Sequence, residues 1–220
     1  MPKIKEVFKW VNWVEERIYP SVRNVPAAYQ EVERVGSSWT QYIDSWVTFD
    51  TSDKLNSLEM YMKATHSGTW NFMWLYNWSY VTMEVVSNTY LRCFIWNGSS
   101  YSDRNVLHSD NTTIDEITYK YTSSLATFII NWTEYTQWRS GWYNTWNTHL
   151  TVFARNYNWS MEQYLTMKLY ACYVELEWER VRNFIPCYRK ADWVIWLYDT
   201  IWQQFYTNSW SGTFTKWNDV

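Results

Sequence analysis

The sequence predicts an all-α fold: a single globular bundle of about eight helices over residues 1–208, followed by a frayed tail over residues 209–220. Three observations support this prediction. Apolar residues recur at three- and four-residue steps in several stretches, glycine and proline stand at the ends of most of them, and two segments carry the pattern of an N-terminal capping box. Agreement among such signals is stronger than any one of them alone.

The amino-terminal third predicts four helices, each recognised by an apolar stripe and a start or stop signal. Proline opens or closes a helix because it cannot continue one, and glycine ends one because it tolerates a left-handed backbone. The stripes and their signals are, in order, Ile4–Ile18 closed by Pro20, Tyr29–Val35 opened by Pro26 and closed by Gly36, Trp39–Val47 behind Ser37 and Ser38, and Leu55–Thr65 capped by Ser52 and closed by Ser67 and Gly68.

The stretch 69–96 allows two interpretations. Aromatic residues alternate strictly from Trp70 to Tyr80, which is the period of a strand, but the residues between them are also largely apolar. A pattern that is apolar on both faces does not decide between strand and helix, and we predict a helix. The alternative is an α+β fold in which residues 69–155 form an antiparallel meander packed on helices, favoured by the abundance of threonine and asparagine over 111–158.

The carboxyl-terminal half predicts the remaining helices. The first capping box runs from Thr113 to Glu116, and the second runs from Ser160 to Gln163. The clearest helical stripe of the chain follows the first box, from Ile114 to Tyr135. The other expected stripes are Trp142–Phe153, Leu165–Arg180, which ends before Pro186, and Val194–Phe205.

Aromatic residues make up 21% of the 220 residues, with 19 Trp and 19 Tyr against only 5 Gly. A globular domain of this length ordinarily carries about 15 glycines, with leucine and alanine among its commonest residues. Two origins account for this composition: a designed or computationally generated (de novo) sequence, or a natural lineage with extreme codon bias. In either case we expect an interior filled with indole and phenol rings.

Charge, cysteine and glycine patterns exclude several classes of function. The formal net charge of −3 leaves no basic field for phosphates, so we predict no nucleic-acid partner. No apolar run approaches the ~20 residues of a membrane-spanning helix, and the amino terminus lacks the apolar stretch of a secretory signal, so we predict no membrane partner and a cytoplasmic location. Three cysteines without C-x-x-C spacing and five scattered glycines predict no disulfide framework, no metal and no cofactor.

Few side chains stand out as chemical candidates, and we predict no catalytic residue. Cys187 lies at the expected start of a helix, where backbone amides and two cations would lower the pKa of its thiol. Asp192 and Asp199, seven residues apart, would share one face of the last expected helix, and the same spacing relates Glu59 to His66. For each of these the favoured interpretation is an ordinary structural or surface side chain. A charged group typical of a solvated helix face is formed by Glu175, Glu177, Glu179, Arg180 and Arg182.

No specific biochemical activity follows from these residues, and an enzyme is the less favoured class. The first hypothesis is a soluble, aromatic-rich helical globule without an active site. The alternative is a small-molecule-binding protein with a Trp/Tyr-lined cavity, suited to sugars, quaternary ammonium groups or flat hydrophobic ligands. Exposed surplus rings also predict self-association. The candidate pocket residues are Trp74, Trp132, Trp146, His149 and Tyr198.

Overall fold

The computed structural model of the chain contains two β-sheets. It describes residues 25–48, 57–67, 69–77, 79–87, 90–96, 101–107, 113–122, 124–138, 149–157 and 160–220. Within these ranges the backbone forms 19 strands and no helix, and hence no helix long and apolar enough to span a membrane. The predictions of an all-α fold and of a helical bundle are therefore wrong. The fold is all-β and sandwich-like.

The larger sheet has eleven strands among the described residues, in the order β11-β10-β9-β4-β15-β16-β17-β18. In addition, β1 pairs with β16, and β2 pairs with both β15 and β19. All of these pairings are antiparallel. The strands are β1 (Tyr29–Glu31), β2 (Val35–Gly36), β4 (Ser57–Ser67), β9 (Asp115–Thr122), β10 (Leu125–Ile130), β11 (Thr133–Trp138), β15 (Thr166–Leu176), β16 (Glu179–Arg189), β17 (Ile195–Asp199), β18 (Gln204–Tyr206) and β19 (Thr215–Lys216).

The smaller sheet has eight described strands, in the order β14-β13-β5-β6-β7-β8, with β12 pairing with both β3 and β5. Its pairings are antiparallel except that of β13 with β5, which run parallel where Tyr157 lies opposite Tyr76. The strands are β3 (Ile43–Asp44), β5 (Trp70–Asn77), β6 (Ser79–Ser87), β7 (Tyr90–Trp96), β8 (Tyr101–Leu107), β12 (Thr151–Val152), β13 (Arg155–Tyr157) and β14 (Ser160–Glu162).

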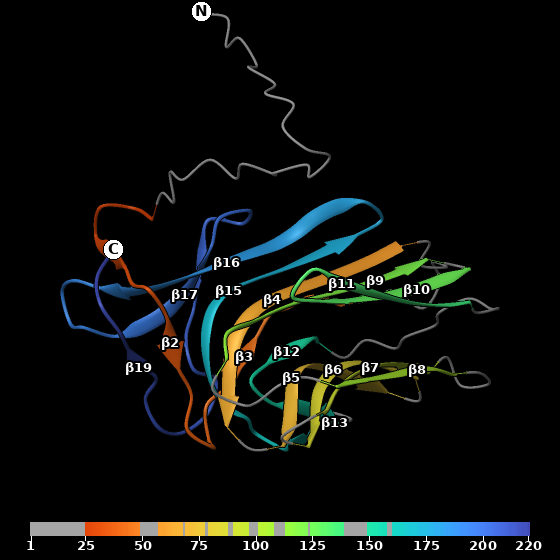
Figure 1. Cartoon of the computed structure of the whole chain (residues 1–220). Coiled ribbons are helices and arrows are strands. Elements are labelled where there is room, and N and C mark those ends of the chain that lie inside the picture. Colours follow the sequence, from red (N-terminus) through yellow and green to blue (C-terminus); the bar gives the residue numbers. More distant parts are fainter. Residues whose placement is uncertain are drawn as a thin grey trace, which may run out of the picture.

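The two sheets form two layers, with the core between them (Figure 1). Burying one apolar face of each sheet in this way is the main source of stability in a β-sandwich. The larger sheet contributes a row of inward side chains from its central strands: Leu58, Met60, Met62, Ala64, Ile117, Tyr119, Tyr121, Cys172 and Val174. The smaller sheet contributes Phe72, Met73, Val81, Met83, Leu91, Cys93 and Val152 to the same cluster.

Residues 114–138, where the sequence predicts its clearest helix, form β9, β10 and β11 instead. Burial along β9 alternates at every residue, so its true period is two. The apparent helical stripe combined residues from three consecutive strands. Thr113 and Glu116 form no capping box, because Glu116 lies on β9 and pairs with Lys63 of β4. The aromatic and β-branched residues that replace alanine and leucine in this chain favour strands, and this signal outweighs the spacing.

The stretch 69–96 follows its alternating pattern and not the predicted helix, because it forms β5, β6 and β7. Antiparallel strands also cover much of 69–155, as in the α+β alternative. That alternative is nevertheless wrong, because the described ranges contain no helices on which such a meander would pack.

Two more of the expected helices are replaced by strands. Strands β15 and β16 replace the helix over Leu165–Arg180, and β17 and β18 replace the helix over Val194–Phe205. The predicted helix over Ile4–Ile18 lies outside the described residues. In the tail 209–220, where we expected fraying, β19 pairs with β2 and Asp219 forms a bridge with Val32.

Indole rings do not fill the interior, contrary to our expectation. The buried core consists of aliphatic, phenyl and phenol side chains and includes none of the tryptophans whose side chains the structure describes. Nine tryptophans are exposed: Trp39, Trp46, Trp132, Trp138, Trp178, Trp193, Trp202, Trp210 and Trp217. Since tryptophan is on average a highly buried residue, this distribution requires an explanation.

Candidate functional site

The structure does not gather the predicted pocket residues into one site. Trp132 is 84% exposed in the turn after β10, whereas Tyr198 is buried on β17, with its ring centroid 4.6 Å from that of Phe205. Five strands lie between β11 and β17 in the larger sheet. Trp74 lies on β5 in the smaller sheet, opposite Thr82. Trp146 falls outside the described residues.

His149 binds a carboxylate at the rim of the smaller sheet. Its Nδ1 lies 2.8 Å from Oδ2 of Asp44, while Oδ1 of Asp44 accepts a hydrogen bond from the backbone N–H of Trp46 at 2.9 Å. The Trp46 ring lies beside the imidazole, with a centroid distance of 4.6 Å. Ser45 is the neighbouring hydroxyl, but it is fully buried and donates to the carbonyl of Leu150 at 2.5 Å. Ser45 is therefore not an accessible nucleophile beside the His–Asp pair.

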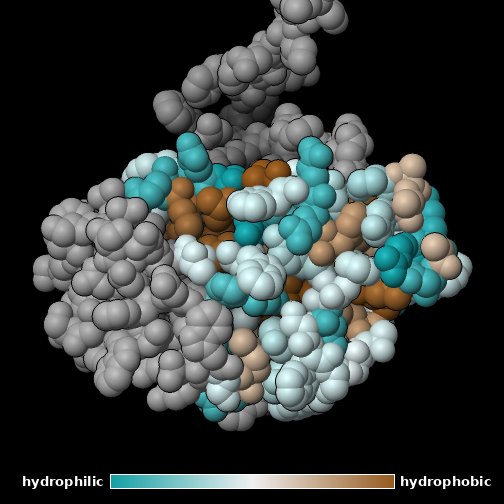
Figure 2. All heavy atoms as spheres, turned by 180° about the vertical axis from the view of Figure 1, so that it is seen from behind, coloured by the Kyte–Doolittle hydropathy of each residue, from teal (hydrophilic) through white to brown (hydrophobic). Residues whose placement is uncertain are grey.

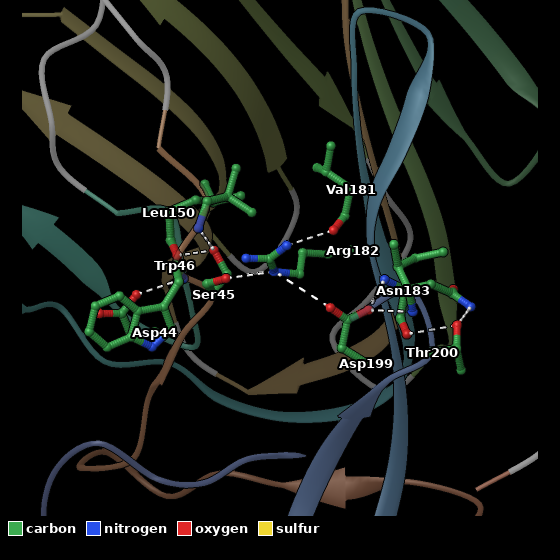
Figure 3. Close-up of polar contacts among 11 residues, drawn as sticks. Asp44, Ser45, Trp46, Leu150, Val181, Arg182, Asn183, Asp199 and Thr200 are labelled. Carbon is green, nitrogen blue, oxygen red and sulfur yellow. Dashed lines mark hydrogen bonds and ion pairs between the residues drawn. The ribbon is translucent and has the colours of Figure 1, made fainter. Parts of the chain in front are cut away.

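Arg182 and Asp199 form a buried ion pair between the sheets (Figure 3). The Arg182 Nε lies 3.6 Å from Oδ2 of Asp199 and donates a hydrogen bond of 2.7 Å to the carbonyl of Ser45. Because Arg182 lies on β16 and Ser45 directly follows β3, this guanidinium links the larger sheet to the smaller one. Both charged side chains are at most 4% exposed. We therefore interpret the pair as a structural cross-link.

Burial raises the pKa of Asp199, and three hydrogen bonds to backbone N–H groups and the charge of Arg182 oppose that rise. Two of the donors are Asn183 and Ile201, at 3.0 and 3.1 Å. Asp192, by contrast, is exposed, and its pKa is lowered by hydrogen bonding to Arg189. The two aspartates therefore do not form the acid–base pair that helical spacing suggested. Asp192 lies in the turn before β17, and Asp199 ends that strand.

Cys187 does not have the environment of an activated nucleophile. It lies in the interior of β16 and is completely buried. Desolvation, with the negative charge of Glu31 nearby, raises the pKa of its thiol to about 12. The hypothesis that helix amides lower this pKa is wrong, because no helix begins at Cys187.

Glu59 and His66 lie on the same strand, β4, and not on one face of a helix. Side chains seven residues apart on a regular strand point to opposite faces, because the period is two. The ring of buried His66 packs against Phe72 with centroids 5.4 Å apart. Among the described residues no group of three or more histidine, cysteine or acidic side chains could hold a metal ion.

A shallow groove of about 140 Å³ opens at one end of the larger sheet. Strands β4 and β15 and the turns after β9 and β15 meet there. The turn after β15 is tied to β4, because the Trp178 N–H donates to Oγ of Ser57 at 3.0 Å and the Glu177 N–H donates to its carbonyl at 3.1 Å. This sheet-end groove is lined by Ser57, Leu58, Glu59, Lys120, Tyr121, Thr122, Leu125, Thr127, Glu175 and Trp178.

Two carboxylate–cation pairs, Glu59 with Lys120 and Glu175 with Arg180, stand at the sheet-end groove. Lys120 Nζ lies 2.9 Å from Oε2 of Glu59, and the Tyr173 hydroxyl donates to Oε1 of Glu59 at 2.5 Å. Arg180 Nε donates to Glu175 at 2.8 Å, and its guanidinium carbon lies 3.4 Å from the centre of the Tyr173 ring. Two carboxylates and two cations therefore stand side by side, together with apolar carbon and hydroxyl groups.

A second ion pair on the same two strands lies outside the groove. Lys63 Nζ of β4 lies 2.8 Å from Oε1 of Glu116 of β9, four residues along each strand from the pair of Glu59 with Lys120. It has the same chemistry, similar exposure and the same strand partners. It therefore serves as a matched control for the groove.

The sequence analysis singled out two residues of this site, Glu175 and Arg180, but predicted a different arrangement for them. Glu175 and Arg180 were assigned to one solvated helix face, whereas they lie opposite each other on β15 and β16. Arg182, assigned to the same face, points into the core. Glu59 and Lys120 are far apart in sequence, and only the pairing of β4 with β9 makes them neighbours.

Apolar surface is not gathered in one large area on the face shown in Figure 2. Small apolar areas are separated there by polar and charged residues. The sheet-end groove is also far smaller than the 300–1,000 Å³ of a typical small-molecule pocket. Of the described residues, only Trp178 and Tyr121 bring aromatic rings to the groove, so it is no Trp/Tyr-lined cavity. Self-association stays a prediction.

No protein-family model matches the sequence, and no curated protein matches it. Among solved structures the chain is similar to mouse laminin alpha1 chain, domains LG4-5, with a TM-score of 0.46 and 12% sequence identity. The match covers 71% of this chain and 44% of that chain, so the chain spans less than half of that structure's length. The strand order and pairings of the chain itself define the fold as a mainly antiparallel β-sandwich.

Proposed function

We propose that the protein is a non-catalytic recognition domain that binds one unit of a neutral saccharide in the sheet-end groove. One observation carries the proposal: paired carboxylates and cations surround a hollow that also presents apolar carbon. Glu59 and Glu175 supply acceptors, Lys120 supplies donors, and Leu125 supplies part of the apolar wall, while Arg180 pairs with Glu175 from outside the lining.

The balance of charge favours a neutral ligand. Glu59 and Glu175 are each paired with a cation, and the Glu177 carboxylate accepts from the Ser57 N–H, so the groove has no excess of positive charge to select an anion. Carboxylates are pure acceptors and cations are pure donors, whereas a sugar hydroxyl both donates and accepts. Each carboxylate oxygen has about two acceptor positions, so Glu59 and Glu175 can accept from hydroxyl groups while keeping their present partners.

The size of the groove favours one unit of a longer chain. A volume of about 140 Å³ cannot enclose a drug-sized molecule, but it can hold one group whose neighbours extend over the surface. The aliphatic carbon of Leu125 suits the C–H face of a sugar ring. Binding through this surface replaces the earlier hypotheses of a helical globule and of an aromatic-lined cavity.

Isothermal titration with neutral oligosaccharides of glucose, galactose, mannose and N-acetylglucosamine tests the proposal. We expect at least one of them to bind in the micromolar to millimolar range. Glu59→Gln and Glu175→Gln should each weaken binding about tenfold. A hydrogen bond from the ligand to a carboxylate is stronger by about 1.5 kcal/mol than one to the amide that replaces it.

Glu116→Gln is the matched control, because it breaks the equivalent ion pair outside the groove. It should leave the dissociation constant unchanged within twofold. Thermal unfolding of each variant verifies that it folds. Absence of binding to every oligosaccharide, or an equal loss of affinity in Glu116→Gln and Glu59→Gln, contradicts the proposed function.

A further inference from the structure

Tryptophan occupies half of the left-handed backbone positions held by residues other than glycine. Ten such residues have a positive φ among the described residues, and five of them are tryptophan, although tryptophan makes up only 19 of 220 residues. For a bulky residue this conformation is a genuine outlier, because its Cβ crowds the following carbonyl, whereas glycine adopts it freely. The five are Trp39 (φ 60°), Trp46 (φ 54°), Trp132 (φ 71°), Trp178 (φ 70°) and Trp193 (φ 62°).

Two of these tryptophans lie in turns whose geometry specifies glycine. Asn131 and Trp132 form the two-residue connection between β10 and β11, since Ile130 lies opposite Thr133, and both have positive φ. Glu177 and Trp178 connect β15 to β16 in the same way. A two-residue hairpin turn with two positive φ values is typically Asn-Gly or Asp-Gly. In both hairpins tryptophan stands at the second position, where glycine is preferred.

The side chains at these positions contribute little burial. All five are exposed, from 55% for Trp39 to 84% for Trp132. A tryptophan retained for its hydrophobic area would be expected in the core, where the structure shows none among the described side chains. The Trp46 ring contacts His149 and the Trp193 ring stacks on Tyr188, but even these two side chains stay more than half exposed.

The composition of the chain agrees with this local evidence. The sequence has 5 glycines, about ten fewer than usual for its length, and nine tryptophans are exposed. The triplet UGA is decoded as tryptophan in some translation systems and as glycine in others. We propose that positions 39, 46, 132, 178 and 193 are glycine in the native protein. Its source decodes the triplet UGA as glycine, whereas the present sequence gives tryptophan for the same triplet.

This inference is independent of the proposed function but affects the surface on which that function acts. Glycine at position 178 would open the sheet-end groove on one side and leave Glu59 and Glu175 in place. Glycine at position 46 would uncover the imidazole of His149, which the Trp46 ring now contacts. On this proposal these five indoles form no ligand-binding surface of the native protein.

The gene and the native protein provide the decisive test. We expect the triplet UGA at all five positions, and we expect peptides of the protein isolated from its source to have the mass of glycine at positions 132 and 178. Tryptophan in either peptide, or UGG at these positions, overturns the proposal. Saccharide binding plays no part in this result, so the two proposals can fail separately.

Unfolding by urea tests whether tryptophan at these turn positions strains the backbone, using the chain with its present sequence. Trp132→Gly and Trp178→Gly should each raise the midpoint of unfolding, because they relieve a left-handed tryptophan. Trp138→Gly is the matched control: Trp138 is equally exposed on the same hairpin but lies in strand β11 and is not among the residues with positive φ. It should lower the midpoint. A lower midpoint in all three variants contradicts the assignment of glycine to these turns.

Discussion

The chemistry of Cys187 is decided by its place in the fold. Cys187 lies at a position that would be reactive at the start of a helix, but in the interior of β16 it is enclosed by protein. Desolvation therefore raises the pKa of its thiol to about 12, and the thiolate is scarce at neutral pH. Reactivity here follows from burial, which sequence neighbours do not reveal.

Thiol labelling tests this interpretation. At pH 8 in the folded protein we expect Cys187 to react with iodoacetamide at least a hundredfold more slowly than a free peptide thiol, because the thiol is both buried and protonated. In urea at the same pH it should react at the rate of a free thiol. Mass spectrometry of the peptide containing Cys187 measures both rates, and fast labelling of the folded protein would contradict the assignment.

At the scale of elements, the β10–β11 hairpin shows how the aromatic residues divide. Phe128 of β10 is buried in the core, while Trp138 of β11 is exposed to solvent on the same hairpin. Phe128 lies opposite Tyr135, and its ring belongs to the cluster shared by the two sheets. The hairpin therefore depends on its phenyl ring and not on its indole rings.

Truncation of each ring measures this difference. Phe128→Ala should lower the free energy of unfolding by about 3–5 kcal/mol, since it leaves a cavity in the core. Trp138→Ala should change it by less than about 0.5 kcal/mol, as for other surface substitutions. Urea unfolding followed by circular dichroism gives both values. Similar losses in the two variants would show that the exposed indole packs against something essential.

At the scale of the whole molecule, a buried ion pair of the larger sheet also reaches the segment beside the smaller sheet. Arg182 of the larger sheet donates to the carbonyl of Ser45 beside the smaller sheet and is paired with Asp199. Two buried charges are costly to desolvate, so each depends on the other. The hydrogen bond from Arg182 to Ser45 connects the two sheets, while the ion pair itself lies within the larger sheet.

A double-mutant cycle tests this dependence. Arg182→Leu should lower the free energy of unfolding by about 3–5 kcal/mol, because it leaves the Asp199 carboxylate buried without a counter-charge. The double variant Arg182→Leu with Asp199→Leu should be more stable than the single variant Arg182→Leu, because the uncompensated charge is gone. Strictly additive losses, measured by urea unfolding, would mean that the two groups do not interact.

The amino-acid sequence by itself determined the local properties of this protein. The alternation over residues 70–80 is a strand pattern, and the aromatic and β-branched composition favours sheets. The sequence also determined what is lacking, such as clustered glycines for a nucleotide loop. The helical prediction failed because apolar residues drawn from consecutive strands can coincide with a period of 3.6.

Only the tertiary structure decided which of these residues act together. Glu59 meets Lys120, and Arg182 meets Asp199, because strands distant in sequence pair in one sheet and two sheets stack. Spacing along the chain carries no information about such neighbours, since register and layer order are set by burying one apolar face of each sheet. The same burial leaves the tryptophans whose side chains the structure describes outside the core, which is closed around smaller rings.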